Sequence, residues 1–349
     1  MHSPDGTSRK RFSVSPAWLS CALLLSIVVA LYGATLHYSF VWDDAAYIRE
    51  NYRIHALDWL HVKSFWTRTY LGHYAPVHHL LLALIYSISG NQPFWFHLAN
   101  LLLHMLVVVL LYVLIGKMES PRVALVACLL YVVHPTHVET VAWISESKST
   151  LSFALVLASG LMLVQYHESK SPVRLVLAVL LFGLSALTKI NTVVAPAIFV
   201  IYDYRKKKSI RELDWLVVGI FLVASLALVA AHLQAFGSEE GMLDGIPYSP
   251  RGIRLMNFPM LLSFYMDTAL FPYSLSAWEQ FPVQTTFTWV VGLAWAGLVL
   301  MTSFLYRASQ DVKFWVAWFV VFLMPVLQLV PFPIWVADRY LYKIGRAHV

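Results

Sequence analysis

The sequence predicts an all-α integral membrane protein, a bundle of about nine transmembrane helices with further helices lying at the outer interface. Of its 349 residues, 59% are hydrophobic and only 13% are charged, whereas roughly a quarter are charged in an ordinary soluble domain. The mean hydropathy of +0.65 agrees. A soluble chain this apolar could not cover its surface with polar groups, and a bilayer removes that requirement.

The net charge of +6 does not indicate nucleic-acid binding, because in such a chain basic residues mark the loops on the cytoplasmic side. No nucleic-acid partner is therefore expected. Cys21 and Cys128 both lie inside apolar runs, so the chain offers no disulfide framework.

Apolar runs of roughly 16 to 23 residues recur along the chain, and each is long enough to cross a hydrocarbon core about 30 Å thick. The first run follows residues 1–16, which include the basic stretch Arg9–Arg11. We expect these residues to be a cytoplasmic tail. A cleaved signal peptide is the alternative for this run, which is long for a signal core and has no clear cleavage site. The predicted spans are 17–38, 94–116, 122–134, 150–166, 173–188, 191–204, 215–235, 288–306 and 314–331.

Charge decides between this topology and one in which every apolar run crosses the membrane. About eleven crossings would place the basic run 205–211 on the non-cytoplasmic side, against the positive-inside rule. Two runs are weak spans: Pro76–Ser89 is short and begins with two histidines, and Ile253–Phe271 carries two ionised residues. We expect both to be amphipathic helices at the interface. The basic run then lies in the cytoplasm, where it contacts anionic lipid.

The nine-span topology has a consequence for function, because it brings the chemically versatile side chains to one side of the membrane. With eleven spans, the segment His134–Glu139 would face away from Asp43. The side chains that share one side are Asp43, Asp44, His134, His137, Glu139, Lys189, Asp338 and Arg339.

Asp43 and Asp44 come directly after the first span. Two adjacent acids at a membrane surface can supply a general base or a cation ligand, although a helix cap or a solvated loop uses the same residues. Most of the aromatic residues are expected in interfacial belts. Some flank this loop and could stack on a sugar, namely Trp42, Trp66, Tyr70 and Tyr74.

The segment His134-Pro-Thr-His137-Val-Glu139 places two imidazoles and a carboxylate within six residues. Such a set can bind a metal or hold an acceptor hydroxyl, and hydrogen bonding at the interface is the plainer alternative. The proline argues against a single helix that presents both histidines. If a divalent cation such as Mg²⁺ or Mn²⁺ is bound, its expected ligands are Asp43, His137 and Glu139.

His97, Asn100 and His104 lie in the outer half of the second predicted span, on one helical face. Ionisable groups inside a membrane are costly and commonly line a cavity or contact a partner. Buried hydrogen bonds between helices are the alternative interpretation.

Two cations are candidates for binding a lipid phosphate. Lys189 follows the fifth span and can act as a point charge, or its side chain can simply extend toward the interface. The planar guanidinium of Arg339 suits phosphate, and an ion pair with the neighbouring Asp338 is its alternative.

The last residues, 343–349, have a sequence that indicates read-through into a sequencing adapter. Ile344–Val349 corresponds to the codons ATC GGA AGA GCA CAC GTC, which begin a common sequencing adapter. We therefore expect the natural coding sequence to continue differently after Tyr342, so that the chain is truncated there. A genuine polar C-terminus is the alternative.

Four segments, taken in order, resemble the transmembrane-and-TPR family of O-mannosyltransferases and its bacterial relatives, members of the GT-C glycosyltransferase superfamily. They are 41–51 (VWDDAAYIREN), 96–104 (FHLANLLLH), 131–143 (YVVHPTHVETVAW) and 338–342 (DRYLY). The resemblance covers nearly all of 17–342, the predicted GT-C-like transmembrane domain. In the family, TPR repeats follow this membrane part, so we expect them in a missing C-terminal region.

The resemblance implies a membrane enzyme that takes a sugar, a mannose-like hexose first of all, from a polyprenyl- or dolichyl-phosphate carrier. The acceptor would be a protein hydroxyl or a glycan, on the lumenal face of the endoplasmic reticulum or the periplasmic face of a bacterial inner membrane. An acid after the first span would be the base, here Asp43 or Asp44. The implied acceptor-positioning residues are His134, His137, Glu139, His97, Asn100 and His104, and the implied donor-phosphate ligands are Lys189 and Arg339.

The chain departs from the family at two places. The family often has Lys-Glu where this chain has Lys189-Ile190, and its bacterial relatives often have Glu-Arg-Lys-Asp where this chain has Glu146-Ser-Lys-Ser149. Both departures put the details of the phosphate site in doubt. Two other functions stay open: a transporter, which would hold charges near the midplane of repeated halves, and a non-catalytic membrane scaffold.

Overall fold

The structure, a computed structural model, describes residues 17–237, 249–273, 275–276, 279–329 and 334–343. These residues form helices joined by loops, and no β-strand occurs among them. The prediction of an all-α membrane protein is therefore confirmed. The predictions made for 1–16 and for 344–349 lie outside the described residues.

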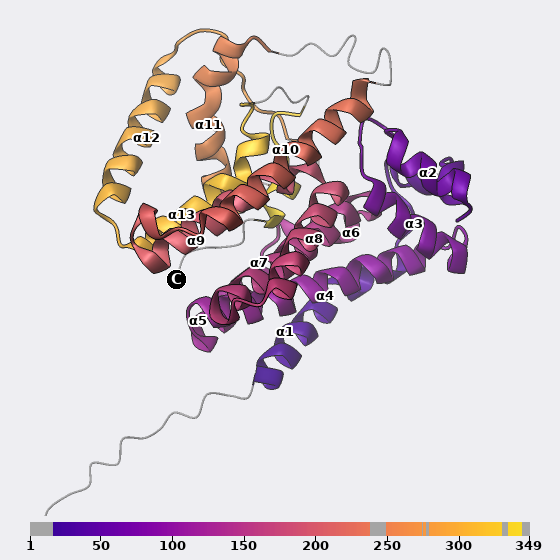
Figure 1. Cartoon of the computed structure of the whole chain (residues 1–349). Coiled ribbons are helices and arrows are strands. Elements are labelled where there is room, and N and C mark those ends of the chain that lie inside the picture. The colour runs from indigo at the N-terminus through magenta and orange to yellow at the C-terminus, as the bar shows by residue number, and fades with distance from the viewer. Residues whose placement is uncertain (1–16, 238–248, 274, 277–278, 330–333, 344–349) are drawn as a thin grey trace, which may run out of the picture.

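Thirteen α-helices are defined within the described part of the chain, and Figure 1 shows their arrangement. They are α1 (Ala17–Tyr32), α2 (Trp59–Thr67), α3 (Pro76–Ser89), α4 (Pro93–Met118), α5 (Pro121–Val132), α6 (His137–Ala142), α7 (Ser147–Ser169), α8 (Pro172–Thr188), α9 (Ala195–Lys207), α10 (Trp215–Gly237), α11 (Arg251–Leu270), α12 (Trp289–Arg307) and α13 (Gln310–Leu323).

Among the described residues, five helices are long and apolar enough to cross a membrane: α1 with its continuation to His37, α4, α7 with the turn before it, α10 and α12. The apolar helices α3, α5 and α8 are shorter. The predicted span 314–331 needs a correction, because α13 ends at Leu323. Pro325 lies two residues after Leu323, and proline has no amide hydrogen to continue a helix. The total of nine spans stays a prediction.

Helix α7 is the centre of the bundle. Of its most apolar stretch 72% is buried inside the protein, compared with 11% for α10 and 6% for α12. Small polar side chains allow close contact with α8, where Ser159 Oγ donates to the carbonyl oxygen of Ala178 at 2.7 Å and Ser185 Oγ donates to that of Ser152 at 2.6 Å. Close helix contact through small residues is the usual packing mode in membranes. The exposed apolar helix α12 lies beside α11 at the edge of the molecule (Figure 1).

Asn100 ties three helices together. Its Nδ2 donates to the carbonyl oxygens of Thr140 and Val141, both at 2.9 Å, and its Oδ1 accepts a hydrogen bond from Thr150 Oγ1 at 2.6 Å. The amide is completely buried, and all its bonds are to protein groups, as a buried amide requires. The side chain therefore fixes α6 and the start of α7 against α4.

Charged side chains collect at two opposite ends of α7, which is about 35 Å long at 1.5 Å per residue. At its C-terminal end Glu168 lies 3.5 Å from Lys117, and Lys170 lies 3.3 Å from Asp214. At its N-terminal end lies the buried Glu146. This separation matches the thickness of a bilayer, so we expect the two charged clusters at opposite interfaces.

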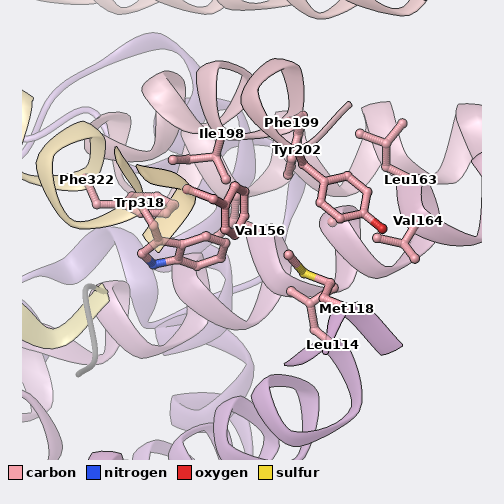
Figure 2. A pocket seen from close by; sticks show the side chains of 12 residues that line it. Leu114, Met118, Val156, Leu163, Val164, Ile198, Phe199, Tyr202, Trp318 and Phe322 are labelled. Carbon is pink, nitrogen blue, oxygen red and sulfur yellow. The ribbon is translucent and has the colours of Figure 1, made fainter. Parts of the chain in front are cut away.

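An apolar pocket lies between α4, α7, α9 and α13 (Figure 2). It includes Leu114, Gly160, Phe199 and Trp318 among its lining residues. A Cβ atom added at Gly160 would lie 3.4 Å from the Phe199 ring, so α7 and α9 are in van der Waals contact here. The pocket has no ionised lining residue and belongs to the packing of the bundle rather than to the charged cluster.

The two charged ends generate a test of topology. In a variant without Cys21 and Cys128, single cysteines introduced at Asp43 and Lys208, both exposed positions, should react with a membrane-impermeant thiol reagent from opposite sides of sealed vesicles. Labelling of both positions from the same side would contradict this orientation of the helices.

Candidate active site

Glu146 lies at the centre of the charged cluster before α7, in the short turn Ile144–Glu146. It is only 3% exposed. Its Oε2 accepts a hydrogen bond from Lys189 Nζ at 2.9 Å, and its Oε1 lies 3.6 Å from Lys148 Nζ and 3.8 Å from Arg339 Nε. One buried carboxylate is therefore in contact with three cations that come from three separate parts of the chain.

Arg339 makes the second carboxylate contact of the cluster, with Glu139 of α6. Its backbone amide donates to Oε2 at 3.0 Å and its Nη1 donates to Oε1 at 2.6 Å. Burial raises the pKa of Glu139, while the guanidinium opposes that change. The ion-pair partners of Arg339 are thus Glu139 and Glu146, where the sequence offered Asp338 as the alternative.

The two lysines reach the cluster from different directions. Lys189 follows the last residue of α8, as predicted, and its Nζ donates also to Ser149 Oγ at 2.6 Å. Burial lowers the pKa of Lys189, and the carboxylate of Glu146 acts against that effect. Lys148 lies with its Nζ 5.1 Å from the centre of the Tyr47 ring, a cation–π contact.

Three cations and two carboxylates thus meet in a nearly closed space, where the side chains of Lys148, Lys189 and Arg339 are 7%, 14% and 12% exposed. With their ordinary charges the five groups carry one excess positive charge. Because buried charges are poorly screened, these five groups interact strongly with one another.

Asp43 and Asp44 differ sharply in their surroundings. Asp44 is fully buried: its Oδ1 accepts hydrogen bonds from the amide of Ser145 at 2.8 Å and from its hydroxyl at 2.6 Å, and its Oδ2 accepts one from the amide of Val41 at 3.1 Å. Burial raises the pKa of Asp44, and these hydrogen bonds oppose the rise. Asp43, one residue earlier, is exposed.

The histidines of the segment 134–139 form a second, less polar layer. His134 Nδ1 lies 2.6 Å from Thr136 Oγ1, and its Nε2 lies 3.0 Å from the carbonyl oxygen of Ala269. His137 is 2% exposed and packs against Tyr131, with ring centres 4.2 Å apart. Both ring nitrogens of His137 have no hydrogen-bond partner among the described residues, and burial holds its pKa well below the ordinary value.

The three residues of α4 lie on one buried face, as their spacing predicts. Besides the structural Asn100, His104 Nδ1 lies 2.7 Å from the Tyr342 hydroxyl, and the His97 ring lies edge-to-face with Tyr38 at 6.2 Å. These contacts place His97 and His104 inside the protein. Their role in positioning an acceptor stays a prediction.

The metal site expected from Asp43, His137 and Glu139 stays a prediction. Among the described residues, no group of three His, Cys, Asp or Glu side chains lies close enough to hold a metal ion. The reason is geometric: Glu139 is engaged by Arg339, and His137 packs among aromatic rings.

The structure brings most of the sequence-derived candidates to one end of the bundle, including Glu139, Lys189 and Arg339. It also adds three groups that the sequence reasoning did not select: Glu146, Lys148 and Ser145. The first two carried a signal that could have identified them, because ionised residues at the start of an apolar helix are rare without a function or a partner. Ser145 had no such signal.

Comparison with known proteins finds one family and several relatives that are similar to this chain. Residues 73–233 match a family described as dolichyl-phosphate-mannose-protein mannosyltransferase. The chain is similar to the protein O-mannosyl-transferases TMTC3 of Mus musculus (30% identical over 196 residues, 52% of this chain and 21% of the relative) and Tmtc2 of Drosophila melanogaster (26% over 326 residues, 82% and 35%). TMTC1 of Homo sapiens is 28% identical over 216 residues, 56% of this chain and 24% of the relative.

The chain spans only about a fifth of the length of the mouse relative. No solved structure matches the chain significantly. The chain is thus a multi-pass membrane protein with long apolar helices. Over the matched regions it is similar to proteins named O-mannosyl-transferases.

Glu146 generates a stability prediction. Glu146→Gln removes the charge that three buried cations share, and breaking a buried ion pair costs about 3–5 kcal/mol. We expect a clearly lower midpoint of thermal unfolding in detergent. Glu168→Gln is the matched control, because its pair with Lys117 at 3.5 Å is exposed and such pairs contribute about 0–1 kcal/mol. Equal effects of the two variants would contradict the central role of Glu146.

Asp338 generates a prediction of pH dependence. Burial, together with the carboxylates of Glu139 and Glu279, raises the pKa of Asp338 to about 7, compared with about 3.9 in an unfolded chain. Between these values the folded state keeps a proton that the unfolded state has released. The contribution of Asp338 to the free energy of unfolding therefore falls as pH rises through this window, and it is constant above it.

Asp338→Asn should therefore weaken the fall in the unfolding midpoint between pH 5 and pH 8, measured by thermal denaturation in detergent at each pH. Glu50→Gln, at an exposed acid, serves as the control. An unchanged pH profile for Asp338→Asn would show that another group causes the dependence.

Proposed function

We propose that this chain is the membrane part of a glycosyltransferase that moves a mannose-like hexose from a polyprenyl- or dolichyl-phosphate carrier to a hydroxyl group. A protein hydroxyl is the first candidate acceptor, and the reaction takes place on the lumenal or periplasmic face. The observation that carries the proposal is an exposed acid, Asp43, at the end of the bundle where a buried ionic cluster has an excess positive charge.

The excess charge supports an anionic donor. A lipid-linked sugar has its phosphate at the interface and its tail in the bilayer, and the cluster lies at an end of helices long enough to span the bilayer. Lys189 and Arg339 are each bound to a carboxylate, so they are already oriented. Oriented cations stabilise the charge that develops on a leaving phosphate without further reorganisation.

The two aspartates take different roles in this proposal. All three hydrogen bonds to Asp44 come from the protein itself, so its carboxylate anchors the loop to Ser145. Asp43 is free to approach an acceptor and is the proposed general base. A base must come within hydrogen-bond reach of the proton that it removes, and only the exposed acid meets that condition.

The reaction then proceeds in one inverting step. The acceptor oxygen forms a bond to the anomeric carbon while its proton passes to the Asp43 carboxylate. The bond from the anomeric carbon to the phosphate oxygen breaks, and the phosphate keeps the electron pair. The location of the charges favours this chemistry over transport, because they lie at an end of the bundle rather than at the middle of its helices.

Asp43→Asn tests the proposal directly. Sugar transfer from dolichyl-phosphate-mannose to a serine- and threonine-containing peptide should fall by about 10²–10⁴-fold, the usual contribution of a general base. The unfolding midpoint should stay unchanged because the side chain is exposed. Glu50→Gln should keep full transfer.

Asp44→Asn should instead lower the unfolding midpoint. The side-chain NH₂ group of the asparagine would face the backbone N–H of Val41, which would lose its acceptor. Full transfer by Asp43→Asn, or loss of transfer without loss of stability in Asp44→Asn, would contradict the assignment of the base. Absence of any transfer by the unaltered chain with this donor would contradict the proposed reaction.

A further inference from the structure

Trp42, directly before the proposed base, has a strained backbone. Its φ angle is +46°, in the left-handed region that a residue with a bulky side chain rarely adopts. Strain of this kind persists only where the surrounding structure enforces it, and it concentrates at functional sites.

The neighbouring aspartate enforces this conformation. The amide of Asp44 donates to the carbonyl oxygen of Val41 at 2.9 Å, and the Asp44 carboxylate accepts from the Val41 amide at 3.1 Å. Because Ser145 binds the same carboxylate, the turn is fixed to the segment before α7. Trp42 and Asp43 are the two residues at the tip of this turn.

The strain does not serve to bury the indole, because Trp42 is 59% exposed. Its ring meets Trp143 edge-to-face, with ring centres 5.1 Å apart and planes at 88°. The guanidinium of Arg339 lies 5.4 Å from the centre of the Trp143 ring. The two indoles therefore form a continuous aromatic surface from the proposed base to a cation of the buried cluster.

Trp143 is the partly buried member of this surface. Its Nε1 is buried and has no hydrogen-bond partner within the described part of the chain. Indole N–H groups in buried positions usually have an acceptor. Because this N–H is enclosed by protein atoms, Trp143 contributes to the surface by packing its ring against Trp42.

We propose that Trp42 and Trp143 form the subsite for the hexose of the donor. The exposed indole of Trp42 stacks on the apolar face of the pyranose ring, and Trp143 supports that indole through its edge-to-face contact. This inference rests on the function proposed above and adds the residues that recognise the sugar. The tyrosines near the loop have other roles, because the Tyr70 hydroxyl donates to the carbonyl oxygen of Ala46 at 2.6 Å and that of Tyr74 donates to the carbonyl oxygen of Trp66 at 3.0 Å.

The strained backbone permits a sharp test. Trp42→Asn and Trp42→Gly remove the indole and supply residues that tolerate a positive φ. Both should keep or raise the unfolding midpoint while transfer falls at least tenfold, with a higher KM for dolichyl-phosphate-mannose. Trp42→Phe, which keeps an aromatic face, should retain most of the transfer.

Two matched controls are available. Leu71 has the same φ of +46° and is 46% exposed, so Leu71→Gly relieves the same strain without touching the indole surface. Trp59, at 75% exposure, controls for a general role of tryptophan at the membrane interface. Leu71→Gly and Trp59→Ala should both keep full transfer.

A second readout separates the subsite from the reaction. Methyl α-mannopyranoside should show saturation-transfer NMR contact with the unaltered protein, and this contact should be lost in Trp42→Asn. Sugar contact that depends on Trp42, in a protein without transfer, would support the subsite and contradict the proposed reaction.

Two results would overturn the subsite. One is a Trp42→Asn variant with full transfer and unchanged sugar contact. The other is a large drop in the unfolding midpoint of Trp42→Asn and Trp42→Gly, because it would mean that the indole serves packing on Trp143.

Discussion

The buried carboxylate of Glu146 is the interaction on which the rest of the site depends. Lys148, Lys189 and Arg339 reach it from different parts of the chain. Its negative charge offsets the cost of burying them, since an isolated buried ion is very costly. Arg339 in turn donates hydrogen bonds to Glu139, so the contact between these two residues joins α6 to the segment Asp338–Lys343. The site is thus a network of charges assembled at the start of the most buried helix.

The same short segment also orders the loop after α1. Ser145, one residue before Glu146, supplies two hydrogen bonds to Asp44. This contact turns the chain so that Trp42 and Asp43 extend outward and Asp44 inward. Two adjacent residues of one type thereby acquire opposite environments, one buried and hydrogen-bonded, the other exposed. The difference arises from tertiary contacts, because nothing in the pair itself distinguishes the two aspartates.

The excess positive charge and the exposed acid lie at the same end of helices whose length matches a bilayer. This placement suits a substrate that is itself divided, with a polar head at the interface and an apolar tail among lipids. The apolar pocket near Gly160 and Phe199, by contrast, lies farther along α7 and has no ionised lining residue. The buried charges, rather than this apolar pocket, therefore locate the candidate site.

The sequence by itself determined the membrane class and most of the helices, because long apolar runs have few alternatives to crossing a bilayer. It also indicated which charged residues share one side, since the positive-inside rule depends only on the order of charges and spans. The sequence placed the end of the last predicted span at residue 331, because the apolar run continues past Pro325. In the structure, α13 ends at Leu323.

Only the tertiary structure decided which acid is exposed, which carboxylate unites the cations, and that Trp42 adopts a strained conformation. These features depend on contacts between residues far apart in the chain, such as Asp44 with Ser145 and Glu139 with Arg339. Local sequence patterns carry no information about such pairings. Their energies depend on burial, which only the folded chain establishes.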